Sequence, residues 1–283
     1  MAEPRAFKRI VLGLQPSAPA SIMNLAVELA DLLHLDLLGL FLEDTSLRDL
    51  ASMPFAREFR LLEGGWRRLD LDRLVEDFEL AARSTERMFA HATKGLPIRC
   101  QFEVIHGSTG ETIASISRTD DIVMIVEPAS PVGRATQQFS WLIEAAFQSA
   151  AAVLLVPIHI ARTSGSVVAI VASPDDPSLD AAAAIAIAAR EELVVFEARE
   201  GIIDDAYIRR LAADFSLPIR HLAGSLSLFA SGALPPAFRQ LRERLVVMTR
   251  GVFGDEVALT IAAARRAPVL VIEPPEMRPK ATE

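Results

Sequence analysis

The sequence predicts an α/β protein made of two tandem domains, each with a parallel sheet flanked by helices. Short β-branched runs alternate with longer helical patterns along the whole chain, which is the signal for parallel strands joined by helices. The tetrapeptide Leu96-Pro97-Ile98-Arg99 recurs as Leu217-Pro218-Ile219-Arg220, 121 positions later. The chain has 283 residues, the length of about two domains. A repeat this long indicates a duplicated domain, because the units of a solenoid are far shorter.

The first half contains five expected strands and four expected helices. The strands are expected at 9–14, 35–42, 98–105, about 121–127 and 153–157. After the first strand, apolar residues recur at helical spacing, at Ile22, Leu25, Ala26, Leu29 and Leu33. A second helix is expected at about 70–93, with Leu74, Phe78, Ala81 and Ala82 inward. Ser108-Thr109-Gly110-Glu111 is a capping-box pattern that opens a third helix, and a fourth covers about 139–150.

The second half repeats this order after a linker at 162–165. Its strands are expected at 166–171, 192–196, 218–222, 245–249 and 269–272. Asp176 and Pro177 suit the N-cap and first position of an alanine-rich helix. A further helix is expected at 203–215, and Pro235-Pro236 opens a short one. The expected domains are therefore 1–160 and 165–283.

The two halves differ in length at two places. The offset between equivalent residues is 157 at the first strand but 121 at the third, so the first half carries 36 more residues between them, mostly at about 43–72. This inserted segment has too many apolar residues for a free loop. It either covers the first-domain crevice as a lid or packs against the second domain or another subunit, and packing is the favoured interpretation. The second half lacks seven residues after its fourth strand, where the offset falls from 123 to 116.

Composition excludes several classes of protein. The formal charge of −8 argues against a nucleic-acid partner, since phosphates are held by clustered Lys and Arg. Four arginines do gather between residues 57 and 68, and they are interpreted as a solvated helix face. No stretch approaches the roughly 18 uncharged apolar residues of a membrane helix. The N-terminus lacks the apolar core of a secretion signal, and the single Cys100 fits a reducing compartment, so a cytoplasmic location is expected.

Several segments resemble the universal stress protein family in its tandem, two-domain form. The best matches are Thr119 to Val126 and Ala267 to Ile272. Residues 40–44 and 50–58 resemble a sequence motif found in a bacterial subgroup of such proteins. The resemblance covers nearly the whole chain. It implies two Rossmann-like domains of the adenine nucleotide alpha hydrolase type, each a five-stranded parallel sheet of order 3-2-1-4-5 with helices on both faces. It also implies a nucleotide crevice at the carboxyl ends of strands one and four, in keeping with the general rule for open parallel sheets.

The ATP-binding motifs of that family are degenerate in the first half. ATP-binding members carry an Asp at the end of strand one and G-x-x-G-x9-G-[ST] after strand four, where glycines let backbone amides approach the phosphates. Here Gln15 takes the Asp position. The loop 127–134 has Gly133 as its one glycine, followed by Arg134, and Phe139-Ser140 stands at the G-[ST] position. Arg134, Thr136, Gln137 and Ser140 could still supply polar contacts to a differently posed nucleotide.

The motifs of the second half are degenerate as well. Ala172 takes the Asp position. Gly251-Val252-Phe253-Gly254 keeps G-x-x-G, but Asp255-Glu256 follow at once and would repel phosphate. G-x-x-G is a weak signal, and a tight strand-to-helix turn is the favoured interpretation of Gly251 and Gly254. We therefore expect ATP binding to be lost in both domains.

No other pattern of catalytic or metal-binding residues stands out. The five histidines show no metal-ligand spacing, and no nucleophile elbow is present. His106, at the end of strand three, either contacts a ligand in the crevice or has a loop or cap role. Cys100 is interpreted as a buried small hydrophobe, and Asp175-Asp176 as a helix cap.

The favoured function is a non-catalytic, cytoplasmic stress protein that acts through protein–protein contacts, without a cofactor. Its expected partners are a second copy or its own other domain, and an unidentified protein. The alternative is a stress sensor that binds ATP or AMP in the first-domain crevice. The candidate crevice positions are Gln15, His106, Gly133, Arg134, Ser140, Gly251 and Gly254.

Overall fold

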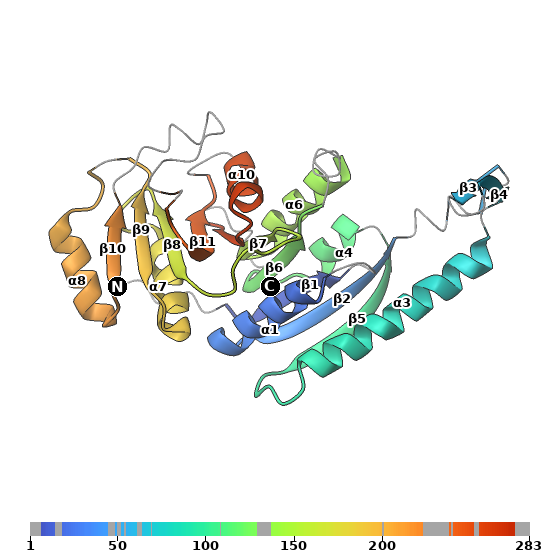
Figure 1. Cartoon of the computed structure of the whole chain (residues 1–283), viewed down its shortest axis with the longest axis horizontal. Helices are drawn as coiled ribbons and strands as arrows, with labels where there is room; N and C mark the ends of the chain where they lie inside the picture. The colour runs from blue at the N-terminus through green and yellow to red at the C-terminus, as the bar shows by residue number, and fades with distance from the viewer. Residues whose placement is uncertain are drawn as a thin grey trace, which may run out of the picture.

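The chain folds around one large, mostly parallel sheet with helices on both faces (Figure 1). The structure, a computed structural model, describes residues 7–14, 19–44, 49, 52–53, 55–60, 64–68, 70–107, 109–128, 137–199, 201–222, 238, 240–251 and 255–274. The prediction of an α/β fold is confirmed. The expected short helix at Pro235-Pro236 and the cap at Ser108 lie outside the described residues.

Ten strands form this sheet, in the order β10-β9-β8-β11-β12-β7-β6-β1-β2-β5. The strands of the first half are β1 Arg9–Leu14, β2 Asp36–Asp44, β5 Cys100–Gly107, β6 Asp121–Val126 and β7 Ala152–Val156. Those of the second half are β8 Ser166–Val171, β9 Leu193–Glu197, β10 Ile219–Leu222, β11 Glu243–Thr249 and β12 Val269–Ile272. Within each half neighbouring strands are parallel, whereas β12 and β7 pair antiparallel and join the halves into one sheet.

The helices lie on the two faces of the sheet. In chain order they are α1 Ala20–Leu33, α3 Leu71–Ala92, α4 Thr109–Ile116, α6 Gln137–Ser149, α7 Pro177–Ala189, α8 Asp205–Phe215 and α10 Asp255–Arg265. Alternate strand residues point to opposite faces. One core packs against α1, α3, α7 and α8, and the other against α4, α6 and α10. Because both faces are covered, the central strands are almost wholly apolar, as expected for a buried parallel sheet.

A buried carboxylate opens the fourth strand of each half. Asp121 begins β6 and accepts from Arg9 at 2.6 and 3.1 Å. Glu243 begins β11 and accepts from Arg265 at 2.5 and 2.9 Å. In each pair two guanidinium nitrogens face two carboxylate oxygens, the geometry of a strong charge-assisted contact. Each pair lies at the amino ends of the strands of its own half, where it fixes strand four and leaves the carboxyl ends of those strands for a site.

The linker is held close to the sheet by Gly165. Its N–H donates to Glu191 at 3.0 Å, and its φ of +128° is one that residues other than glycine rarely adopt. A Cβ at this position would lie 2.0 Å from the carbonyl oxygen of Arg242. The backbone can therefore pass this close to Arg242 as it enters β8 only because residue 165 is glycine.

The inserted segment contains a hairpin that the sequence analysis did not anticipate. Its strands are β3 Arg57–Arg60 and β4 Gly65–Arg68, paired antiparallel. Arg57, Arg60, Arg67 and Arg68 thus lie on strands, and their assignment to a helix face was wrong, because Gly64, with a φ of +63°, turns the chain so that the two segments pair. Figure 1 places the hairpin beyond the first residue of α3, at the end of the molecule opposite β10, so it does not pack against the second half.

Helix α3 is the longest helix of the described chain, with 22 residues, or about 33 Å. It was expected to bury Leu74, Phe78, Ala81 and Ala82, but only Ala82 is buried, and the other three are half-buried. The buried residues Ala82, Thr85 and Phe89 all lie in its second half. The first half of α3 therefore reaches beyond the main sheet and leaves its apolar stripe partly uncovered.

Candidate functional site

The carboxyl ends of β8 and β11 meet at the carboxylate of Asp176. Asp176 is the N-cap of α7, with Pro177 in the first turn, as predicted. It accepts hydrogen bonds from the N–H of Ala172 at 2.9 Å and the N–H of Ser178 at 3.0 Å. It also accepts from the hydroxyls of Ser178 at 2.8 Å and Thr249 at 2.5 Å. The side chain is buried, so these four donors satisfy a carboxylate that water does not reach.

This hydrogen-bonded cluster lies where the crevice between strands one and four would open in the second half. Ala172, the residue at the family's Asp position, directs its N–H to Asp176. Thr249 ends β11 two residues before Gly251, which lies in an exposed turn with φ of +83°. The structure thus brings Ala172 and the end of β11 together through Asp176. Gly254 lies outside the described residues.

Arg250, between Thr249 and Gly251, contacts the first half of the chain. One guanidinium nitrogen lies 3.3 Å from Oε2 of Glu273, which follows β12, and another lies 3.0 Å from Oε2 of Glu144 on α6. The guanidinium also stacks 4.3 Å from the ring centre of Phe147. A cation that follows strand four could serve a phosphate, but here it lies between two carboxylates and an aromatic ring. Its positive charge is balanced at the junction of the two halves.

The corresponding crevice of the first half is described only in part. Gln15, Gly133 and Arg134 lie outside the described residues. Ser140 is exposed in the first turn of α6, and its neighbour Phe139 is buried in the core against that face of the sheet. Phe139 is therefore a core residue of α6. The sequence signal for this was its helical spacing from Ile143 and Ala146, which share the same core.

His106 pairs with Glu43 at the carboxyl ends of β5 and β2. The two residues are in register, and Nδ1 of His106 lies 2.6 Å from Oε2 of Glu43. The Glu43 side chain is buried, whereas that of His106 is 56% exposed. The imidazole of His106 is therefore held at the surface by a buried carboxylate. Within the described residues, no group of three His, Cys, Asp or Glu side chains could hold a metal ion.

A second Glu–His pair, which the sequence analysis missed, occupies a similar place in the second half. His221 of β10 lies 3.2 Å from the carboxylate of Glu197, the last residue of β9. Glu197 also accepts from the N–H groups of Gly201 and Ile203, at 2.9 and 2.7 Å, and so shapes the turn that follows. Strand pairing places Glu197 level with Phe41 rather than Glu43 in the first half. His221 lies level with Phe102, four residues before His106, and these unequal shifts concealed the likeness in the sequence.

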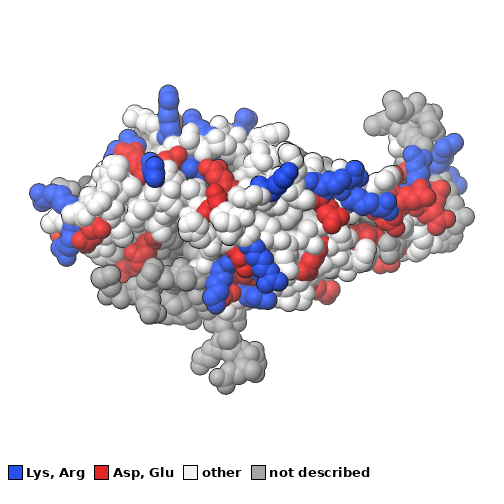
Figure 2. All heavy atoms as spheres, turned by 90° about the horizontal axis from the view of Figure 1, so that it is seen from below, with Lys and Arg blue, Asp and Glu red and all other residues white. Residues whose placement is uncertain are grey.

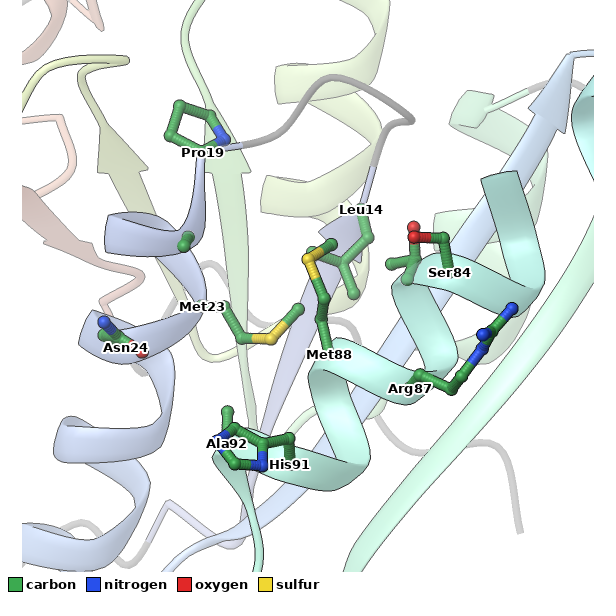
Figure 3. Close-up of a pocket in the computed structure, with 11 residues that line it drawn as sticks. Leu14, Pro19, Met23, Asn24, Ser84, Arg87, Met88, His91 and Ala92 are labelled. Carbon is green, nitrogen blue, oxygen red and sulfur yellow. The ribbon is translucent and has the colours of Figure 1, made fainter. Parts of the chain in front are cut away.

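A groove between α1 and α3 adjoins the end of β1 (Figure 3). It has a volume of about 400 Å³. In Figure 3 Met23 of α1, Met88 of α3 and Leu14 of β1 point toward one another. Arg87 and His91 are the ionisable side chains of its lining, so among the residues that the structure describes no carboxylate lines the groove.

The helices that begin beside the two crevices differ at their first residues. The helix α1 begins after Pro19, with no side-chain cap and no acid in its first turn. The equivalent helix α7 has the Asp176 cap and Asp180 in its first turn. An uncapped helix N-terminus carries a partial positive charge and unsatisfied N–H groups. The N-terminus of α1 in the first half can therefore attract an anion. In the second half, the carboxylate of Asp176 already occupies the N-terminus of α7.

Cys100 begins β5 and is half-buried among apolar neighbours. Burial raises the pKa of its thiol, the charge of Asp36 raises it further, and a hydrogen bond with Thr93 lowers it. A raised thiol pKa opposes nucleophilic chemistry. This agrees with its interpretation as a small hydrophobe.

The fold is shared with solved structures of low sequence identity. The chain resembles a universal stress protein from Archaeoglobus fulgidus DSM 4304 with a TM-score of 0.57 and 12% identity, covering 94% of this chain and 97% of that one. It resembles a functionally unknown protein from Pseudomonas aeruginosa PAO1 with a TM-score of 0.54 and 17% identity, covering 96% and 95%. No family model and no curated protein matches the sequence. These likenesses define the class by architecture: the chain has a universal-stress-protein-like α/β fold.

In the described part of the chain, no helix combines the length and the apolar character needed to cross a membrane.

Proposed function

We propose that this chain is a non-catalytic stress protein that acts through protein–protein contacts and has lost the nucleotide binding of the family it resembles. In this proposal the two halves of the sheet, β5-β2-β1-β6-β7 and β10-β9-β8-β11-β12, are duplicated domains of strand order 3-2-1-4-5. They pair within the chain through β7 and β12. A cytoplasmic location is part of the proposal, and the single cysteine fits a reducing compartment.

The observation that carries the proposal is the buried Asp176 carboxylate with its four donors. A phosphate entering the crevice of the second half would meet a buried negative charge instead of free N–H groups. Displacing Asp176 would also leave the Thr249 hydroxyl without this acceptor, at a cost of about 1–3 kcal/mol, whereas the Ser178 hydroxyl still has the carbonyl of Ile170 at 3.0 Å. In the first half, the support is the sequence itself, with Gln15 and Phe139 at the family's Asp and glycine positions.

Thermal unfolding with ATP, ADP and AMP tests this proposal. A nucleotide present at 100 times its Kd stabilises the folded state by about 2.7 kcal/mol. We expect no change in Tm at millimolar nucleotide. A nucleotide-dependent rise in Tm would overturn the loss of binding.

An adenine-nucleotide sensor that uses the first half is the second candidate. The observation in its favour is the uncapped start of α1 beside a groove whose ionisable lining is Arg87 and His91. If a nucleotide raises Tm, Arg87→Ala should reduce that rise. Arg83→Ala is the matched control, because Arg83 lies one turn earlier on α3, is exposed and pairs with Glu79 at 2.6 Å. Equal effects of the two substitutions would exclude the groove.

A further inference from the structure

One edge of the ten-stranded sheet is formed by β5, which among the described strands pairs with β2 alone (Figure 1). All eight residues of β5 lie level with a residue of β2, so this edge strand is long and regular. The strand at the opposite edge, β10, has four residues. A short edge strand resists pairing with another chain, whereas a long regular one presents a row of unpaired backbone groups. A further strand can therefore add to the sheet at β5.

The backbone groups of alternate β5 residues point away from β2. The N–H of Leu37 donates to the C=O of Arg99 at 2.9 Å, while Leu37 lies level with Cys100. In a parallel ladder this pattern directs the N–H and C=O of the level residue, Cys100, to the side away from its neighbour. Phe102 and Val104 follow at intervals of two residues, so their backbone groups point the same way. The open edge thus offers a donor and an acceptor at each of these residues.

Segment 98–104 has an apolar face and a polar face, because successive strand residues point to opposite sides of a sheet. The apolar face continues the core beside α3 and carries Ile98, Cys100, Phe102 and Val104. Phe102 packs against Phe89 of α3, with ring centres 5.7 Å apart, and Val104 is 43% exposed. The polar face carries three exposed residues, Arg99, Gln101 and Glu103. A cation and an anion therefore lie at equal distances on either side of Gln101.

This order of side chains is complementary to itself when two copies of the strand run antiparallel about Gln101. Arg99 of each copy then lies opposite Glu103 of the other. The apolar face pairs apolar residues only, Ile98 with Val104 and Cys100 with Phe102. Opposite charges and apolar pairs directly across an antiparallel ladder stabilise it, whereas like charges destabilise it. A register centred on Glu103 would place two carboxylates opposite each other, so charge selects Gln101 as the centre.

The hydrogen bonds of the backbone permit the same register. Cys100 and Phe102 both direct their N–H and C=O groups outward, so pairing them exchanges two hydrogen bonds. The two Gln101 residues then form a pair without hydrogen bonds, with Cα atoms about 4.5 Å apart. The chain already contains a joint of this kind, because β7 and β12 pair antiparallel and connect two parallel half-sheets. An antiparallel β5–β5 pair would extend the sheet in the same manner.

The face of the molecule in Figure 2 carries basic and acidic side chains in small adjoining groups, with no wide patch of either sign among the described residues that it shows. A large surface of one charge would favour a polyanion or a polycation as the partner. The complementarity of segment 98–104 is instead local and includes both signs, so it fits a strand with the same order of charges. A second copy of this chain provides that strand, and two-fold symmetry repeats every contact.

We propose that β5 is a homodimerisation edge, at which two copies pair antiparallel about Gln101 and continue the sheet across a two-fold axis. The proposal rests on the proposed function in one respect, because it names a second copy as one protein partner. It does not depend on the state of the nucleotide crevices. The dimer is isologous, with Arg99 of each copy beside Glu103 of the other.

Cysteine crosslinking of the full chain tests the register. Cys100 is the single cysteine, so in a Cys100→Ala background Gln101→Cys introduces one thiol per copy. The two thiols meet at the two-fold axis with Cα atoms about 4.5 Å apart, and mild oxidation should give a covalent dimer. Glu103→Cys in the same background is the matched control, because it lies on the same exposed face. Its two copies lie about 13 Å apart along the ladder, too far for a disulfide, so it should stay monomeric.

Sedimentation equilibrium from about 1 to about 200 μM measures the dimer Kd. We expect a monomer–dimer equilibrium in the wild type. Val104→Pro removes an N–H that points outward and leaves the bonds to β2 in place, so it should raise Kd about tenfold or more. Val104→Thr is the matched control, because it keeps both the N–H and the β-branched shape, and its Kd should stay within about threefold of the wild type.

Charge reversal gives a test that a merely structural effect cannot imitate. Arg99→Glu and Glu103→Arg each place like charges opposite each other twice, so each should raise Kd about fivefold or more. Mixed together, the two variants should form a heterodimer, since one copy then carries two carboxylates and the other two guanidinium groups. Both positions are exposed, so the core is unchanged, and circular dichroism checks that each variant is folded.

A wild type that stays monomeric across this range would overturn the proposal. So would equal crosslinking at positions 101 and 103, a dimer that a folded Val104→Pro variant leaves unchanged, or reversed variants that do not recover on mixing. The nucleotide experiment is independent, because a rise in Tm with ATP would refute the proposed loss of binding without affecting the dimer. Conversely, a monomeric chain without nucleotide binding would refute the β5 edge alone.

Discussion

The hydroxyl of Thr249 donates to the carboxylate of Asp176 over 2.5 Å, and this bond links the end of β11 to the start of α7. The two residues are 73 positions apart in the chain. With this bond, the first and fourth strands of the second half are closed at the edge where open parallel sheets usually bind ligands. The second half therefore uses that edge for stability.

Replacing Asp176 should destabilise the protein far more than replacing its neighbour. Asp176→Ala removes the acceptor of four hydrogen bonds and leaves buried donors unpaired, so we expect a loss of about 2–4 kcal/mol. Asp175→Ala, at an exposed position, should cost about 0.5 kcal/mol or less. Urea unfolding of both variants measures the difference. Equal losses would mean that the cluster contributes nothing beyond an ordinary turn.

Two strand glycines should respond differently to alanine. A Cβ at Gly39 of β2 would lie 2.8 Å from the ring of Phe89 and 3.1 Å from that of Phe102, so Gly39→Ala should cost about 1–3 kcal/mol through overpacking. A Cβ at Gly13 of β1 would meet its nearest atom at 3.9 Å. Gly13→Ala should therefore be neutral or stabilising by up to about 1 kcal/mol. The free energy of unfolding of each variant tests this prediction. If Gly13→Ala cost more than Gly39→Ala, the prediction would be wrong, and α3 with Phe89 would have moved to make room for the new methyl group.

Arg250 should matter more than its exposed partner. Arg250→Met takes the guanidinium from the buried Glu273 and from the ring of Phe147, and we expect a loss of about 2–3 kcal/mol. Glu144→Gln removes only the exposed partner, whose side chain is 50% accessible, and should cost about 0.5 kcal/mol or less. Thermal unfolding of the two variants measures the loss of stability that each substitution causes. A larger effect of Glu144→Gln would contradict the assignment of Glu273 as the main partner.

Cys100 should react slowly with thiol reagents in the native protein. Burial and the Asp36 charge raise its pKa, so less thiolate is present than in the unfolded chain at the same pH. The native state favours the protonated thiol. This contribution to stability is therefore complete below the unfolded pKa and is lost as pH rises through the folded pKa.

The rate of iodoacetamide modification against pH measures this effect. We expect its midpoint to lie at higher pH in the native protein than in urea. Asp36→Asn should shift the native midpoint downward, because the carboxylate charge no longer opposes ionisation. A native midpoint at or below that of the unfolded chain would contradict the stated cause.

Much of the fold follows from local signals in the sequence. The buried strands are continuous apolar runs, such as Val167 to Val171, and a run of this kind needs helices on both faces wherever it pairs. The Asp176-Pro177 cap is equally local, because both residues act on the backbone next to them. These features depend on neighbours in the chain, and the structure confirms them.

The candidate site was less predictable because its contacts join distant residues. Asp176 was recognised as a cap, but its bond to Thr249 depends on β8 and β11 lying side by side. The Glu197–His221 pair depends on strand register, which is displaced from that of Glu43 and His106. The hairpin could not be predicted from its sequence, because each strand has four residues with one large apolar side chain, Phe59 or Trp66, and so shows no strand period.

The sequence by itself determined the α/β class and the Leu-Pro-Ile-Arg repeat, because strand and helix periods and residue identities are local properties. Only the tertiary structure decided that β7 and β12 join the halves into one sheet, that Asp176 bonds to the end of β11, and that the β3-β4 hairpin lies beyond the N-terminal end of α3. These outcomes depend on register and on which surfaces remain uncovered after packing, and a one-dimensional pattern does not contain that information.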